Sequence, residues 1–260
     1  MKNNLLTSKP ASSAVLRKGL MILLSFNAVE DNLSLSELAR KVELPVATTN
    51  RILKALCETR FLERNEKTKR YELGSQCYYL GAVARRSGTL RKLALPIMRD
   101  LRDTFLETVI LYVRDGANRV YYEQVEGPKT IKRLIEPGTK VPIWVGSAGR
   151  CFMAYMSQEE IDSVTPAVRR ISRNTITDIP RLLQEIQNTR IMGYAVSCSE
   201  REEGVWSVSV PIFNGPDSVC AVLTVTGPEW RLNEELTEKI ITGVKASAGS
   251  LSRKLQGLGT

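Results

Sequence analysis

Apolar residues recur at helical spacing in three successive segments within the first 60 positions of the chain. They predict helices at residues 13–29, 34–41 and 45–59. Ser34 and Glu37 have the spacing of a capping box, and Pro45 suits the first position of a helix. The short turn between the last two helices completes a helix-turn-helix pattern. The residues expected on their buried faces are Leu35, Leu38, Ala39, Ile52, Leu53 and Leu56.

A short hairpin is predicted directly after these helices. Phe61 and Leu62 precede a charged stretch at residues 64–70, and Tyr71 and Leu73 follow it. The tip of this hairpin carries Lys67, Lys69 and Arg70. Three helices followed by a basic hairpin predict a winged helix, whose wing contacts phosphates beside a helix in the major groove. Either element alone is common in proteins that bind no DNA, so the prediction depends on their order.

The rest of the chain alternates helical and strand-like patterns. Helices are expected at residues 76–88, 90–107, 147–156, 178–192 and 233–255, and strands at 108–114, 119–125, 131–136, 194–199, 205–212 and 219–226. This order predicts an α+β domain around an antiparallel sheet. The expected division is a leader at 1–12, a winged helix at 13–75, a linker helix at 76–88 and an α+β domain at 89–260.

Two features of the α+β segment suggest a ligand site. The small residues at 146–149 introduce a helix, whose first N–H groups favour an anion such as a carboxylate, although a tight packed turn has the same sequence pattern. In two strands, Ser207 and Ser209, and likewise Thr224 and Thr226, share one face. If the strands pair, these hydroxyls line either a pocket or a solvent-facing stripe.

Charge and composition favour a polyanion partner over catalysis. The formal net charge is +9, and the first 75 residues hold 13 Lys/Arg against 8 Asp/Glu, compared with 24 against 20 in the remainder. The chain has no histidine, which removes Ser-His and Cys-His pairs and most transition-metal sites. Its five cysteines form no C-x-x-C pair, which argues against zinc and a disulfide framework. No Walker or GxGxxG fingerprint occurs, so no cofactor is expected. Without a long apolar run or signal core, a cytoplasmic protein is expected.

An enzyme is the rival interpretation. Cys151 stands near a predicted helix start, where a thiol pKa can be lowered, and a histidine-free hydrolase with a helical appendage is conceivable. The acidic run at residues 200–203 is interpreted as a solvated loop near the pocket rim rather than a catalytic carboxylate pair.

The segments LSLSELARKVELPVATTNRILKALCETRFLER and KRYELG resemble the winged helix of IclR-type transcriptional regulators. Pro45, Thr48, Arg51, Ile52 and Leu53 match the family's turn and recognition helix, whereas Val46, Ala47, Thr49 and Asn50 depart from it. The resemblance implies a regulator that binds double-stranded operator DNA. The expected DNA-binding residues are Ser36, Val46, Ala47, Thr48, Thr49, Asn50, Arg51, Lys54, Lys67, Lys69 and Arg70.

The later segments GTKVPIWVGSAGRCFMAYMS, ITDIPRLLQEIQNTRIMGYAVSCSEREEGVWSVSVPIF and AVLTVTGP are also similar to this family. They imply a GAF-like domain that binds a small organic metabolite, in a homodimer or a dimer of dimers. The effector-binding residues that the resemblance implies are Trp144, Gly146, Ser147, Ala148, Ser197, Ser207, Thr224 and Thr226. At Ser197 the family commonly has an aspartate, at Ser207 a cysteine and at Trp144 a histidine. The loss of the acid favours a small organic acid effector, aromatic or otherwise bulky, while Trp144 serves either the pocket or the core.

Overall fold

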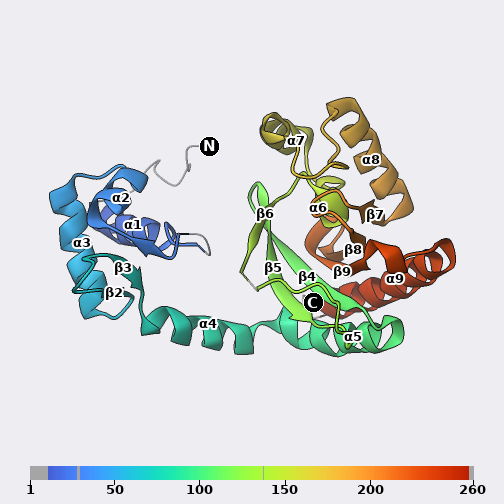
Figure 1. The fold of residues 1–260 in the computed structure, drawn as a ribbon, viewed down its shortest axis with the longest axis horizontal. Coiled ribbons are helices and arrows are strands. Elements are labelled where there is room, and N and C mark those ends of the chain that lie inside the picture. Colours follow the sequence, from blue (N-terminus) through green and yellow to red (C-terminus); the bar gives the residue numbers. More distant parts are fainter. Residues whose placement is uncertain (1–10, 28–29, 137, 258–260) are drawn as a thin grey trace. The chain divides into compact units, whose positions relative to one another are not determined.

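The computed structural model describes residues 11–27, 30–136 and 138–257, which divide into two compact units after Gly88 (Figure 1). The expected leader at residues 1–12 lies outside the described residues except for Ala11 and Ser12, which begin the first helix. Within the described ranges, no helix is long and apolar enough to cross a membrane.

The first unit is a winged helix. Its elements are α1 (Ala11–Leu23), β1 (Asn32–Leu33), α2 (Leu35–Lys41), α3 (Val46–Glu58), β2 (Leu62–Arg64), β3 (Tyr71–Leu73) and α4 (Ser75–Ser87). The three strands form an antiparallel sheet in the order β1-β3-β2. Of the expected core residues, Leu38, Ala39, Ile52 and Leu53 are buried, whereas Leu35 and Leu56 pack against the core while half-buried.

Local hydrogen bonds explain where these helices begin and end. The predicted capping box is present, since Ser34 Oγ accepts from the Glu37 N–H at 3.3 Å and Glu37 Oε2 accepts from the Ser34 N–H at 2.7 Å. Helix α1 ends at Leu23, so its predicted extension to residue 29 is wrong for residues 24–27, and residues 28–29 lie outside the described ranges. Asn27 Oδ1 instead accepts from the Glu30 N–H at 3.1 Å, which is a local turn that competes with helix.

The second unit is built on a six-stranded antiparallel sheet in the order β6-β5-β4-β9-β8-β7. The strands are β4 (Thr108–Asp115), β5 (Asn118–Val125), β6 (Lys140–Pro142), β7 (Ala195–Cys198), β8 (Val205–Gly215) and β9 (Ser218–Pro228). The helices are α5 (Thr89–Phe105), α6 (Gly146–Met153), α7 (Gln158–Val164), α8 (Ile179–Met192) and α9 (Glu234–Gln256), with short 3-10 turns η2 (Thr165–Ala167) and η3 (Glu229–Arg231).

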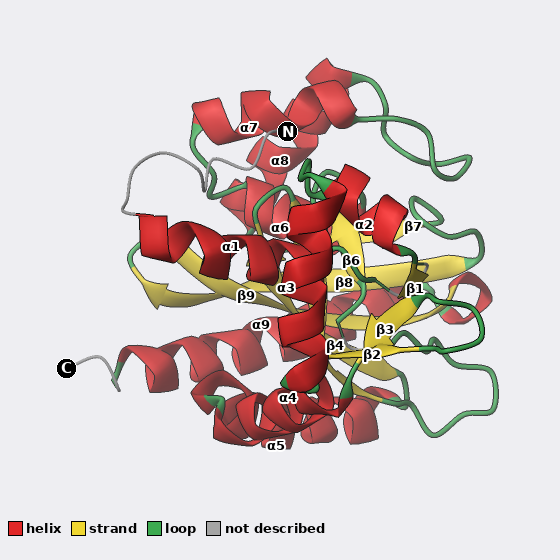
Figure 2. Ribbon diagram, turned by 90° about the vertical axis from the view of Figure 1, so that its left-hand side faces the viewer, coloured by secondary structure: helices red, strands yellow, loops and turns green. Residues whose placement is uncertain are grey.

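Helices cover both faces of this sheet. Figure 2 shows α5 and α9 on one side, with α6, α7 and α8 on the other. Each side has its own apolar core: Trp206, Val208 and Leu223 pack towards α5 and α9, and Ile110 and Phe152 belong to the opposite core. The predicted alternation along β8 and β9 is therefore confirmed.

Two parts of the second unit differ from the sequence prediction. The strand predicted at residues 131–136 is wrong, because this segment is an irregular loop in which the Ile135 N–H bonds to the Gln124 side chain at 3.2 Å. Strand β6 and helix α7 were not predicted, although α7 begins with a capping box formed by Ser157 and Glu160.

Candidate functional site

Helix α3 presents a polar outer surface above a buried apolar face. Val46, Ala47, Arg51 and Lys54 are exposed, as is Ser36 on α2, while Thr48 and Asn50 are half-buried. Thr49 corrects the sequence expectation: its side chain is 0% exposed and donates from Oγ1 to the Pro45 carbonyl at 3.1 Å. The buried Thr49 side chain therefore faces the core and is not available to contact a base.

The wing contains two exposed lysines and one arginine with an internal role. Asn65 Oδ1 accepts from the N–H groups of Lys67 and Thr68, which leaves the side chains of Lys67 and Lys69 exposed near the tip. The Arg70 side chain is 37% exposed and also bonds within the winged helix. Its guanidinium donates to Asn32 Oδ1 at 2.7 Å and to Glu37 Oε2 at 2.7 Å, which ties the wing to the start of α2.

The second unit holds a small polar cavity of about 30 Å³ between the start of α6, the sheet and the loops after β5 and β7. Its lining residues are Tyr112, Arg119, Tyr121, Arg133, Gly146, Ser147, Ala148, Ser197, Glu200, Arg201, Glu202, Val205, Ser207 and Thr226. Six residues expected from the sequence therefore lie together: Gly146, Ser147, Ala148, Ser197, Ser207 and Thr226.

The backbone at the start of α6 is shaped by two glycines. Gly146 has φ +76°, a left-handed conformation that side chains rarely adopt. A Cβ atom at Gly149 would lie 1.9 Å from the Ile143 carbonyl oxygen, so only glycine fits there. The N-cap residue Val145 has no side-chain acceptor for the first N–H groups of the helix. This helix start therefore offers N–H donors and a positive dipole end beside the cavity.

A chain of hydroxyl groups leads from the cavity into the sheet. Ser197 Oγ lies 2.8 Å from Ser207 Oγ, and Ser207 Oγ lies 2.8 Å from Ser147 Oγ. Ser147 Oγ is also 2.7 Å from Ser209 Oγ, which lies 2.8 Å from Thr224 Oγ1. The pairing of Ser209 with Thr224 in the β8–β9 register brings these side chains together. The shared hydroxyl face thus points inwards and is not a solvent-facing stripe.

Two expected pocket residues lie elsewhere. Trp144 is buried in the apolar core on the α6 side of the sheet and does not line the cavity, so the core alternative applies. Thr224 is buried at the inner end of the hydroxyl chain and is linked to the cavity through Ser209 and Ser147.

Sequence reasoning missed the arginines and tyrosines of the cavity. Arg119 is 3% exposed and donates to the carbonyls of Pro142 and Val145 at 2.8 and 2.7 Å, while its Nε has no hydrogen-bond partner. Burial lowers the pKa of Arg119, and the neighbouring charge of Arg201 lowers it further. Tyr112 and Tyr121 pack against each other with ring centroids 4.6 Å apart, and burial raises the pKa of Tyr112. The available sequence signal was the two-residue spacing of Arg119 and Tyr121, which places both side chains on the same face of a strand.

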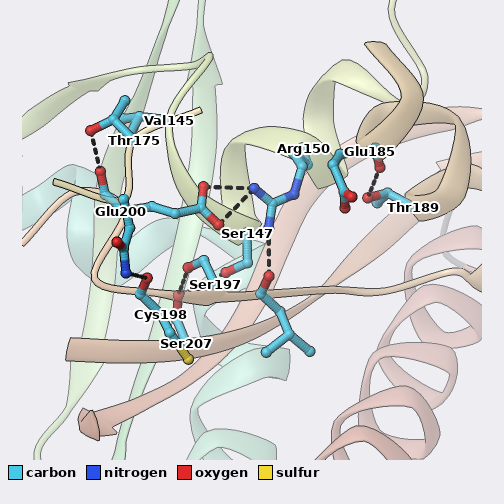
Figure 3. A network of polar contacts seen from close by, with 12 residues as sticks. Val145, Ser147, Arg150, Thr175, Glu185, Thr189, Ser197, Cys198, Glu200 and Ser207 are labelled. Carbon is cyan, nitrogen blue, oxygen red and sulfur yellow. Dashed lines mark hydrogen bonds and ion pairs between the residues drawn. The ribbon is translucent and has the colours of Figure 1, made fainter. Parts of the chain in front are cut away.

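Glu200 corrects the expectation that the whole acidic run is solvated. Its two carboxylate oxygens accept from Arg150 NH1 at 2.8 and 2.6 Å, and the side chains are only 10% and 3% exposed (Figure 3). Arg150 also donates to the Val196 carbonyl, and Thr175 donates to the Glu200 carbonyl at 2.7 Å. This pair fixes the β7–β8 loop against α6.

Cys151 does not have the lowered pKa that the enzyme interpretation needs. Its thiol is fully buried, with Sγ 3.2 Å from the Ser209 carbonyl oxygen. Burial raises the pKa of Cys151 to about 12, although the nearby Arg150 charge opposes this effect. The thiolate, which is the nucleophilic form, is therefore suppressed at neutral pH.

We expect Cys151 to resist thiol reagents in the folded protein, so that wild type and Cys151→Ala show the same number of fast-reacting thiols. Because its folded pKa is raised from 9.0 to about 12, its contribution to stability is intact below pH 9 and is lost as pH rises towards 12. Denaturant titrations at pH 8 and pH 11 measure this loss, which Cys151→Ala should reduce. A fast-reacting thiol that disappears in Cys151→Ala contradicts the assignment.

A winged helix with an exposed basic helix, joined to an α+β unit with a small polar cavity, defines the class of ligand-responsive DNA-binding regulators. Two family models match the chain: the IclR helix-turn-helix domain at residues 15–66 and the bacterial transcriptional regulator IclR C-terminal domain at residues 83–253. The chain belongs to the IclR family of DNA-binding transcriptional regulators, whose C-terminal domain binds an effector.

Named regulators of similar sequence and a solved structure support this assignment. The chain is 32% identical over 237 residues to the HTH-type transcriptional regulator KipR of Bacillus subtilis, covering 90% of this chain and 94% of KipR. It is 26% identical to the HTH-type transcriptional repressor AllR of Escherichia coli K12, covering 85% and 82% of the two chains. An IclR transcriptional regulator structure from Alicyclobacillus acidocaldarius superimposes with a TM-score of 0.81 at 26% identity, covering 95% of this chain and all of that one.

Proposed function

We propose that α3 enters the major groove of operator DNA and that the wing contacts flanking phosphates. Arg51 and Lys54 project from the exposed face of α3, while Ile52 and Leu53 hold its other face in the core. Thr48 and Asn50 stand half-buried at the edges of this face. Arginine and asparagine are side chains that read base edges, and exposed lysines suit phosphates. The exposed basic face of α3 carries this part of the proposal.

We propose a small organic acid as the effector, with its carboxylate beside the start of α6. The observation that carries this assignment is Arg119, a buried guanidinium whose Nε has no hydrogen-bond partner and whose residue lines the cavity. The uncapped helix start and the hydroxyls of Ser197 and Ser207 add donors on the same side. The cavity volume of about 30 Å³ is far below the roughly 300 Å³ at which ordinary ligand pockets begin, so the cavity must widen for an aromatic ring.

We propose a homodimer or a dimer of dimers as the working assembly. The support is a set of exposed apolar residues on two helices, Val15, Leu16, Leu20 and Leu24 at α1, and Tyr78, Tyr79, Leu80 and Val83 on α4. Runs of large apolar side chains at helical spacing are typical of surfaces that pack against another protein. A second copy of this chain is the occupant that two-fold operator recognition requires.

We propose that the protein regulates transcription without catalysing a reaction, and that it acts in the cytoplasm, where chromosomal DNA is found. The buried Cys151 thiol with its raised pKa supports the first point. The basic charge of the first 75 residues supports a nucleic-acid partner.

Small carboxylates are expected to stabilise the full chain, whereas their neutral amides are not. At one hundred times its dissociation constant, a bound acid adds about 2.7 kcal/mol to the free energy of unfolding. Thermal denaturation with paired acids and amides measures this effect, and mobility shifts measure the accompanying change in DNA affinity. Ser207→Ala should weaken the response, whereas Ser218→Ala, an exposed serine on β9, should not. Equal stabilisation by acid and amide would contradict an anion site.

A further inference from the structure

The charges around the cavity are unbalanced. Four guanidinium groups, from Arg119, Arg133, Arg150 and Arg201, face two carboxylates, from Glu200 and Glu202. Arg150 lies outside the lining, and it neutralises the lining residue Glu200 through two hydrogen bonds. Three arginines and one carboxylate therefore remain for the cavity itself, and two positive charges are in excess.

Arg133 is a buried cation whose carboxylate partner comes from the solvent side. Its NH1 atom lies 2.6 Å from Glu202 Oε2, but the Arg133 side chain is 7% exposed and that of Glu202 is 55% exposed. Although burial acts to lower it, the pKa of Arg133 is raised because Tyr121 and Glu202 favour its charge. An ion pair with a half-exposed partner is weak and readily exchanged, whereas the buried guanidinium requires an anion.

The other two cavity arginines have no carboxylate partner among the described residues. Arg201 donates to the Tyr121 hydroxyl and lies over that ring, with its guanidinium carbon 5.5 Å from the centroid. Arg119 bonds only to carbonyl groups through NH1. A single ligand carboxylate near Arg119 leaves one excess positive charge if Glu202 stays in place, and a dicarboxylate that displaces Glu202 leaves the same excess. The choice between them therefore depends on the weak pairing of the buried Arg133 with the half-exposed Glu202.

The loop that carries Glu202 is fixed at its base. The Ser199 N–H bonds to the Val205 carbonyl at 2.8 Å, and the Gly204 N–H bonds to Ser199 Oγ at 2.8 Å. Glu202 lies at the exposed tip between these bonds, so rotation of its side chain releases Arg133 without opening the loop. That rotation also vacates the space next to the cavity.

We propose that the effector is a dicarboxylate and that Glu202 is an internal stand-in for its second carboxylate. The first carboxylate occupies the cavity beside Arg119 and the start of α6, and the second displaces Glu202 from Arg133, within reach of Arg201. This inference rests on the proposed organic-acid site and adds its charge requirement. A monocarboxylate fills only the inner position and leaves the Glu202–Arg133 pair in place.

Calorimetric titration of the full chain with matched acids tests the proposal. The pairs are succinate with butyrate, glutarate with valerate, and terephthalate with 4-methylbenzoate. We expect at least one dicarboxylate to bind about tenfold more tightly than its partner, because its second carboxylate makes a charge-assisted bond to Arg133 in place of the weak pair with half-exposed Glu202. Arg133→Gln should abolish this preference, and Glu202→Gln should strengthen dicarboxylate binding several-fold by removing the competing carboxylate. Lys132→Gln and Glu203→Gln, neighbouring charges outside the cavity lining, should leave the preference unchanged.

The outcomes separate this proposal from the one on which it rests. If monocarboxylates bind as tightly as every matched dicarboxylate, the second position is refuted while the organic-acid site stands. A preference that persists in Arg133→Gln, or weaker dicarboxylate binding in Glu202→Gln, also overturns the stand-in role. If neither member of any pair binds, the organic-acid proposal itself fails.

Discussion

Replacing Arg51 by alanine is expected to reduce operator affinity by about 5- to 150-fold while leaving the folded protein intact. The guanidinium lies on the exposed face of α3, opposite the buried Leu53, so the substitution removes no core packing. Loss of a specific arginine contact to a guanine edge costs about 1–3 kcal/mol, whereas loss of a phosphate contact reduces the salt dependence of binding by about one unit of slope. Mobility shifts at several salt concentrations, with DNA selected by the wild-type protein from random sequences, distinguish the two roles.

The control variant must lose an arginine charge at a site outside α3. Arg169→Ala serves this purpose, because Arg169 is exposed in the second unit and lies outside the cavity lining. It should retain wild-type affinity, and thermal denaturation of both variants should match the wild type within about 0.5 kcal/mol. Undiminished binding by Arg51→Ala would show that α3 does not read the operator.

Replacing Arg150 by alanine is expected to destabilise the second unit by about 3–5 kcal/mol, the usual cost of stranding one member of a buried ion pair. The substitution leaves the Glu200 carboxylate, 10% exposed, without the guanidinium that bonds both its oxygens. It also removes the donor to the Val196 carbonyl. Chemical denaturation should show the loss, and thermal denaturation should show a midpoint roughly 10 °C lower.

Lys140→Ala is the matched control for this prediction. Lys140 pairs with Asp115 at 2.6 Å, but both side chains are more than half exposed, so the loss should stay below about 1 kcal/mol. The double substitution Arg150→Met with Glu200→Leu should recover much of the stability, because no charge is then stranded. A single variant no less stable than Lys140→Ala would show that the buried pair is unimportant for folding.

Local periodicity predicted the elements whose partners lie nearby in the chain. The alternation of Trp206 and Ser207 fixed the faces of β8, and the Ser34–Glu37 spacing identified the start of α2, because both signals depend on neighbouring residues. The end of α1 was missed because the Asn27 turn is stronger than the apolar pattern that continues past it. The segment at 131–136 has strand-like composition but no strand neighbour to pair with.

Only part of the cavity lining was predictable from the sequence, because the other lining residues come together only in the tertiary structure. Ser147 and Ser207 belong to segments with recognisable patterns, whereas Arg119, Arg133 and Arg201 come from separate parts of the chain with no common spacing. Their meeting depends on the β4–β5 hairpin and on two loops, which are tertiary features. At Thr49 the polar residue type did not predict exposure, because the position of a residue around the helix decides whether its side chain faces solvent or the core.

Five hydroxyl groups form one continuous chain of hydrogen bonds, in the order Ser197, Ser207, Ser147, Ser209 and Thr224. Each hydroxyl has a single proton to give, so a proton donated at one end constrains the direction of every bond behind it. An anion that accepts from Ser197 aligns all four bonds towards the cavity, whereas a ligand that donates to Ser197 leaves their direction free, because each hydroxyl oxygen can accept two hydrogen bonds. The centre of the sheet, at Thr224, thereby senses the sign of the group at the cavity mouth without any movement of the backbone.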